Sequence, residues 1–66
     1  MSLESGQVRS LRMELGATQS ELAGMMDVTR ATVANWESGR AICSGAAARL
    51  LAVLVDNFRK KENDGE

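Results

Sequence analysis

The stretch that decides the fold is TQSELAGMMDVTRATVANWESGR, residues 18–40. Thr18 is a predicted N-cap, and Glu21 three residues later completes a capping box, in which each side chain bonds the other residue's backbone N–H. Thr29 is a second predicted N-cap, and the helix that follows it should end at Gly39, because glycine adopts the left-handed conformation easily. The stretch therefore predicts two short helices separated by a turn of about three residues.

The second of these helices has an inward and an outward side. Val33 and Trp36 are three residues apart and share one face, which is more typical of core packing than of a ligand-binding aromatic. The polar and small residues of the helix point elsewhere. Two short helices with a tight turn between them are the layout of a helix-turn-helix. The outward side of the second helix therefore consists of Arg30, Ala31, Thr32 and Asn35.

Helical patterns flank this stretch on both sides. Apolar and amphipathic residues recur at i, i+3, i+4 and i+7 before it, which predicts a helix from about Ser5 to Leu15 that ends at Gly16. Ser44 is the predicted N-cap of a last helix that runs to about Lys60. We find no strand pattern and no internal repeat, and we give residues 1–3 no weight.

The composition supports an all-α fold and excludes several function classes. The chain has no proline, no histidine and one cysteine, so a disulfide framework and a zinc site within one chain are both excluded. We find no glycine-rich phosphate loop, no acidic pair in a plausible cleft and no nucleophile–base arrangement. The sequence therefore predicts neither an enzyme nor a metal or other cofactor.

The charge is unevenly distributed along the chain. The net charge is −1, but residues 28–49 hold three arginines and one glutamate, while residues 62–66 hold three acidic residues and no basic one. A mildly basic middle is compatible with nucleic-acid binding that is modest and sensitive to salt. We expect one domain over residues 1–61 and a flexible acidic tail over residues 62–66. With no membrane span and no leader pattern, we expect a cytoplasmic, nucleoid-associated protein.

The run LRMELGATQSELAGMMDVTRATVANWESGR, Leu11 to Arg40, closely resembles the phage-repressor and Cro-like (XRE-type) helix-turn-helix family. The resemblance extends from about Gln7 to about Leu54. It implies a lambda-repressor-like DNA-binding domain, a small bundle of four to five helices. It also implies a sequence-specific transcriptional regulator, most simply a repressor, that binds double-stranded DNA through a recognition helix in the major groove.

The resemblance also implies roles for individual residues. Gln19 corresponds to a glutamine that approaches a phosphate at the start of its helix, and helix N-termini attract anions. Arg30, Ala31, Thr32 and Asn35 occupy the positions that face base edges. Arginine can bond guanine and asparagine can bond adenine in bidentate fashion. The backbone contacts would come from Thr29, Ser38 and Arg40, although Arg40 is equally interpretable as a plain surface charge.

Three further residues follow or depart from the family pattern. Arg12 and Glu37 match a pair that forms a structural salt bridge in the family, so we expect them to serve architecture rather than binding. Asp27 replaces the glycine that is usual at the turn, at some cost in stability. Cys43 stands where many relatives have proline, and no histidine or lysine lies near it in sequence to activate it.

The sequence allows more than one partner besides DNA. The last helix has more apolar residues than one buried stripe needs, which indicates either a homodimer contact through this C-terminal helix or a helix buried on both sides. A two-fold dimer would suit a palindromic operator. The alternative function is an antitoxin-type module that neutralises a cognate toxin and autoregulates its operon.

Overall fold

The computed structural model describes residues 1–64 and begins with a short strand followed by the first helix, α1 (Ser5–Glu14). The backbone N–H of Glu4 donates to the Gln7 side chain at 2.8 Å, which fixes the start of the helix. The helix ends at Leu15, and Gly16 follows with a φ of +69°. The predicted boundaries of this helix are confirmed.

Helices α2 (Gln19–Met26) and α3 (Arg30–Ser38) begin at the two predicted threonine caps. Glu21 N–H donates to the Thr18 hydroxyl at 3.0 Å and Thr18 N–H donates to the Glu21 carboxylate at 2.8 Å, so the capping box is present. Thr32 N–H donates to the Thr29 hydroxyl at 3.2 Å. The C-caps of the two helices are Asp27 and Gly39, both in the left-handed conformation, and the predicted end at Gly39 is confirmed.

Two short strands were not expected from the sequence. Strand β1 (Ser2–Leu3) pairs antiparallel with β2 (Cys43–Ser44), with Ser2 opposite Ser44 and Leu3 opposite Cys43. Residues 2 and 3, to which the sequence analysis gave no weight, therefore belong to the fold, and Ser44 ends a strand directly before the first residue of α4. A strand of two residues has no readable periodicity, and this ladder joins segments some forty residues apart.

Helix α4 (Gly45–Asp64) is the longest element and extends past the predicted end near Lys60. Residues 62–64, expected to belong to a flexible tail, continue this helix, and residues 65–66 lie outside the described part of the chain. An ion pair of 3.2 Å between Lys60 and Asp56 stabilises the last turns at i, i+4 spacing. The division into a domain of residues 1–61 and a tail stays a prediction.

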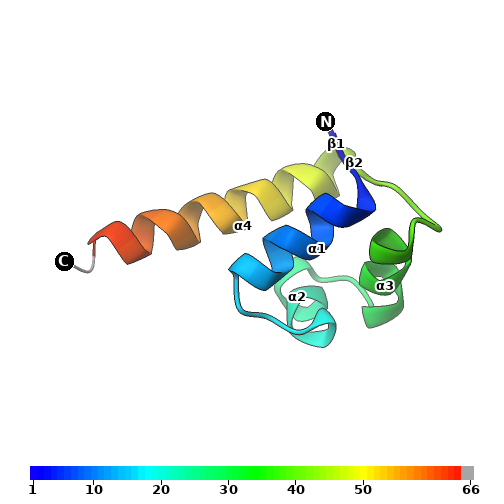
Figure 1. Cartoon of the computed structure of the whole chain (residues 1–66), viewed down its shortest axis with the longest axis horizontal. Coiled ribbons are helices and arrows are strands. Elements are labelled where there is room, and N and C mark those ends of the chain that lie inside the picture. Colours follow the sequence, from blue (N-terminus) through cyan, green and yellow to red (C-terminus); the bar gives the residue numbers. More distant parts are fainter. Residues whose placement is uncertain (65–66) are drawn as a thin grey trace.

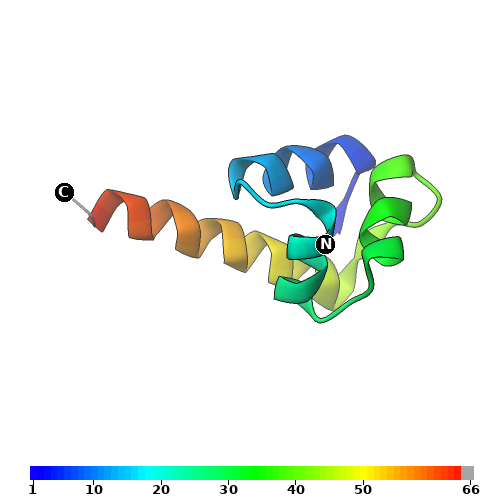
Figure 2. The ribbon, with the colours of Figure 1, turned by 90° about the horizontal axis from the view of Figure 1, so that it is seen from below.

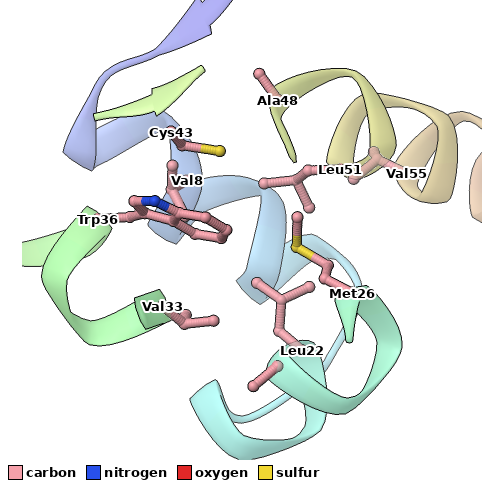
Figure 3. Close-up of a cluster of buried hydrophobic side chains, with 10 residues drawn as sticks. Val8, Leu22, Met26, Val33, Trp36, Cys43, Ala48, Leu51 and Val55 are labelled. Carbon is pink, nitrogen blue, oxygen red and sulfur yellow. The ribbon is translucent and has the colours of Figure 1, made fainter. Parts of the chain in front are cut away.

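The core lies where all four helices meet the strand pair (Figure 3). Leu22, Val33 and Leu51 are fully buried at its centre. Trp36 is 6% exposed and packs among them, so the prediction that it is a core residue is confirmed. The remaining buried members are Val8, Ala23, Met26, Cys43, Ala48 and Val55.

Helices α1, α2 and α3 form one cluster, and the N-terminal half of α4 covers it (Figures 1 and 2). The C-terminal part of α4 projects beyond the other helices, with its end far from α3 (Figure 1). The fold is all-α apart from the strand pair, as predicted. Among residues 1–64, no helix combines the length and the hydropathy that crossing a bilayer requires.

Candidate nucleic-acid interface

The α2–α3 pair is held in one orientation by its buried side. These two helices pack against each other more extensively than any other pair of elements. Leu22 and Met26 of α2 and Val33 and Trp36 of α3 all lie in the core. Because the inward residues of α3 fix its rotation about its own axis, the identity of its outward residues is also fixed.

The outward side of α3 begins at its N-terminus. Arg30 and Ala31 are exposed, whereas Thr32 and Asn35 are half-buried. The Thr32 hydroxyl lies 2.9 Å from the Thr29 hydroxyl, so it is already partnered and its methyl group is the part left for an apolar contact. The side presents a cation, two small groups and an amide, all of which can act at a base edge.

Gln19, the first residue of α2, connects the two helices through its side chain. Its amide nitrogen donates to Glu37 at 3.2 Å, and its amide oxygen accepts from Arg30 at 3.4 Å. The start of α2 therefore lies against both ends of α3. The sequence alone did not indicate this bridge, because the three residues come from separate turns of two helices.

Arg12 and Glu37 form a two-bonded ion pair between α1 and α3. Arg12 Nε donates to Glu37 Oε2 at 2.6 Å and Arg12 Nη2 donates to Glu37 Oε1 at 3.0 Å. A third bond runs from Arg12 Nη1 to the Ala17 carbonyl at 2.9 Å. The side chains are 16% and 7% exposed, so the pair is largely removed from water. The hydrogen bonds from Arg12 hold the pKa of Glu37 below its usual value, against the opposing effect of burial.

The end of α3 is organised by the Asn35 carbonyl, which accepts two bonds. The Ser38 hydroxyl and the Ala41 backbone N–H both donate to it at 3.2 Å. Ser38 and Arg40 are exposed just after the last inward residue of the helix. These bonds hold the chain that leaves α3 close to the helix end, so Arg40 stays near it.

A hollow of about 300 Å³ opens at the junction of α1, α2 and α3. It brings together two predicted contact residues, Gln19 and Ser38, and the structural pair. Arg9 of α1 also lines it, and the sequence analysis did not single this residue out. The sequence could have indicated Arg9 through its position three residues before Arg12, because residues at this spacing are neighbours on one face of a helix. Ala34 completes the lining.

Cys43, whose role the sequence left undecided, lies in the core away from this surface. Its side chain is 1% exposed, and burial raises the pKa of its thiol. A raised pKa keeps the thiol protonated and therefore unreactive. Among residues 1–64, no group of three or more metal-ligating side chains is present.

Comparison with protein families identifies the family of the chain. The model of the helix-turn-helix family HTH_3 matches residues 8–54, which is well over half of the chain and includes most of α1, all of α2 and α3, and half of α4. Comparisons with curated proteins and with solved structures found no significant match. The match spans the residues that carry the resemblance to phage repressors, and the structure has the fold that this resemblance implies. The chain belongs to the helix-turn-helix family and is a DNA-binding regulator of the XRE type.

Proposed function

We propose that this protein is a sequence-specific transcriptional repressor that binds a palindromic operator as a homodimer, with α3 in the major groove. One observation carries the proposal. Val33 and Trp36 anchor α3 to the core, and this anchoring leaves Arg30 and Ala31 exposed at the N-terminal end of the helix. In helix-turn-helix proteins the N-terminal residues of the recognition helix are those that reach base edges.

Base recognition is assigned to four residues of α3. Arg30 bonds the O6 and N7 atoms of guanine, and Asn35 bonds the N6 and N7 atoms of adenine. Ala31 and the Thr32 methyl group contact thymine methyl groups. To reach a base, Arg30 must give up its 3.4 Å bond to Gln19, which is long and weak and therefore easily exchanged.

Backbone contacts are assigned to residues around the ends of the two helices. The free backbone N–H of Gln19 lies at the positive end of α2, where a phosphate is favoured. The Gln19 side chain is already engaged by Glu37 and Arg30, so we assign the contact to its backbone. Thr29, Ser38 and Arg40 supply hydroxyl groups and a charge at the ends of α3.

The dimer is assigned to α4. Ala46, Leu50, Val53 and Asn57 recur at spacings of four and three residues and are all exposed, Leu50 by 38% and Val53 by 48%. This spacing is that of the seam in a helix–helix pair, and the asparagine would favour one register of the pair. Two copies facing each other through this stripe form an isologous contact, as a two-fold operator requires.

The test of the dimer is the oligomeric state in solution. Sedimentation equilibrium of the wild type should give a dimer that Val53→Asp converts to a monomer with unchanged helix content. Lys61→Asp, which adds the same carboxylate on an exposed position near the end of α4, is the control. A wild type that stays monomeric at the highest attainable concentration contradicts the assignment.

The test of sequence-specific repression is selection of bound duplexes from random DNA at stated salt. We expect an enriched motif made of two inverted half-sites about one helical turn apart. Placed over a promoter, this motif should lower transcription in the presence of the protein, because bound protein excludes polymerase. Enrichment of no motif contradicts specific recognition, and increased transcription contradicts repression.

A further inference from the structure

The hollow at the junction of α1, α2 and α3 has an unbalanced charge. Arg12 and Glu37 neutralise each other through two hydrogen bonds, and the third hydrogen bond to Glu37 comes from the neutral Gln19. Arg9 lines the same hollow, is exposed, and makes no ion pair with the side chains that the structure describes, those of residues 1–62. Within those residues, the hollow therefore carries one positive charge that no ion pair balances.

Two observations place the Arg9 charge within reach of this hollow. Arg9 is among the side chains that line it, together with Gln19 and Ser38. The pKa of Glu37, which lines the same hollow, is lowered chiefly by the hydrogen bonds from Arg12 and, least, by the positive charge of Arg9. A cation beside the start of α2 and the end of α3 lies next to the two regions that we assign to backbone phosphates.

We propose that the hollow binds one phosphate of the DNA backbone, with Arg9 as its cation. This inference rests on the proposed function, because it needs α3 to approach DNA from the same side. A guanidinium group can hold two phosphate oxygens at once. Ser38 also lines the hollow, and its hydroxyl group can donate to the phosphate once it releases the Asn35 carbonyl. Helix α1, which lies outside the helix-turn-helix, thereby takes part in DNA binding.

The Arg12–Glu37 pair has a second consequence in this arrangement. If Glu37 were unpaired, its carboxylate would repel a phosphate in the hollow and would attract Arg9 to itself. Because Arg12 saturates the carboxylate, Arg9 remains available for a ligand. The pair therefore keeps the hollow positive as well as joining α1 to α3.

The experiment measures the salt dependence of DNA affinity for the full chain. The variants are Arg9→Gln and the control Lys61→Gln, which removes the same charge at the end of α4 that lies far from α3 (Figure 1). The probe is a duplex of random sequence, titrated at salt concentrations between about 50 and 200 mM. Arg9 is exposed, so Arg9→Gln should keep the wild-type thermal unfolding curve.

We expect Arg9→Gln to flatten the slope of log affinity against log salt by about 0.9 per protomer and to weaken binding on the order of tenfold at 0.1 M salt. Arg9→Lys should restore most of the slope, because the slope reports the number of charges that neutralise phosphates and does not depend on the two-pronged geometry of arginine. Specific and random duplexes should lose affinity by the same factor, since phosphates carry no sequence information.

A slope for Arg9→Gln equal to that of Lys61→Gln would overturn the inference. An effect confined to one specific sequence would also overturn it, since it would make Arg9 a base contact. Failure of the proposed function has a different signature. In that case the wild type itself enriches no motif, whatever the slope of Arg9→Gln.

Discussion

Arg12 and Glu37 lie 25 residues apart in sequence, and their side chains meet through two hydrogen bonds of 2.6 and 3.0 Å. This contact joins α1 to α3 through charged side chains. Val8 of α1 and Trp36 of α3 are both buried in the core that the two helices share. The orientation of α3 is therefore set by a charged contact and by apolar packing.

Replacing Glu37 with alanine should destabilise the fold strongly. The change leaves Arg12 only 16% exposed without its carboxylate, and removing one partner of a buried pair costs about 3–5 kcal/mol. Because Arg12 keeps its bond to the Ala17 carbonyl and some access to water, we expect the lower end of this range. Chemical unfolding followed by the fluorescence of Trp36, the one tryptophan, measures it.

The matched control for Glu37→Ala is Glu14→Ala, which also breaks a two-bonded pair with an arginine. Glu14 and Arg59 are exposed by 36% and 58%, so water screens their interaction and the melting temperature should change little. Equal effects of the two substitutions would show that burial does not distinguish the pairs.

Stability should fall in acid, and Glu37 should account for part of the fall. Arg12 lowers the pKa of Glu37 in the folded state. At a pH between the folded and the unfolded pKa of Glu37, this carboxyl group therefore binds more protons in the unfolded chain than in the folded one. The stabilisation is complete above the unfolded value of about 4.5 and is lost as the pH falls through the folded pKa. Thermal unfolding of wild type and Glu37→Gln from pH 7 to pH 3 measures it.

The difference in melting temperature between wild type and Glu37→Gln should shrink as the pH falls. The pKa of Glu14 is lowered by Arg59 and contributes in the same direction, but it is present in both proteins and cancels. A difference that stays constant from pH 7 to pH 3 would contradict the assignment.

Two glycine-to-alanine substitutions should have opposite signs. Gly16 has a φ of +69° and no atom near enough to clash with a new Cβ, so Gly16→Ala costs only the backbone strain, about 1–2 kcal/mol. Gly24 lies inside α2 with equally free surroundings, and alanine there should stabilise the helix by about 0.5–1 kcal/mol. Urea unfolding of both variants checks the signs, and destabilisation by Gly24→Ala would contradict this account.

Replacing Arg30 or Asn35 with alanine should weaken binding to the selected operator by about 1–3 kcal/mol each. The loss should come with relaxed preference at one base position, because each side chain is assigned to one base pair. Repeating the selection with each variant measures both effects. Lys61→Ala is the control. If a variant binds with unchanged affinity and selects an unchanged motif, the substituted residue does not contact a base.

The sequence by itself determined the starts and ends of α1, α2 and α3. Caps such as Thr18 and Thr29 bond to residues three positions away, and the left-handed ends at Gly16 and Gly39 depend on the backbone freedom of one residue. These signals act within one helical turn, so no tertiary contact is needed to read them. The inward position of Trp36 followed from helical periodicity for the same reason.

Only the tertiary structure decided which distant segments meet. The β1–β2 pairing, the Gln19 bridge from Glu37 to Arg30 and the exposure of Arg9 in a shared hollow all join residues from different elements. The Arg12–Glu37 contact was expected from the family resemblance, and no local pattern predicts it. Such contacts form because packing of the apolar core brings the helices together, and their geometry is set by the packed core and not by neighbouring residues in the sequence.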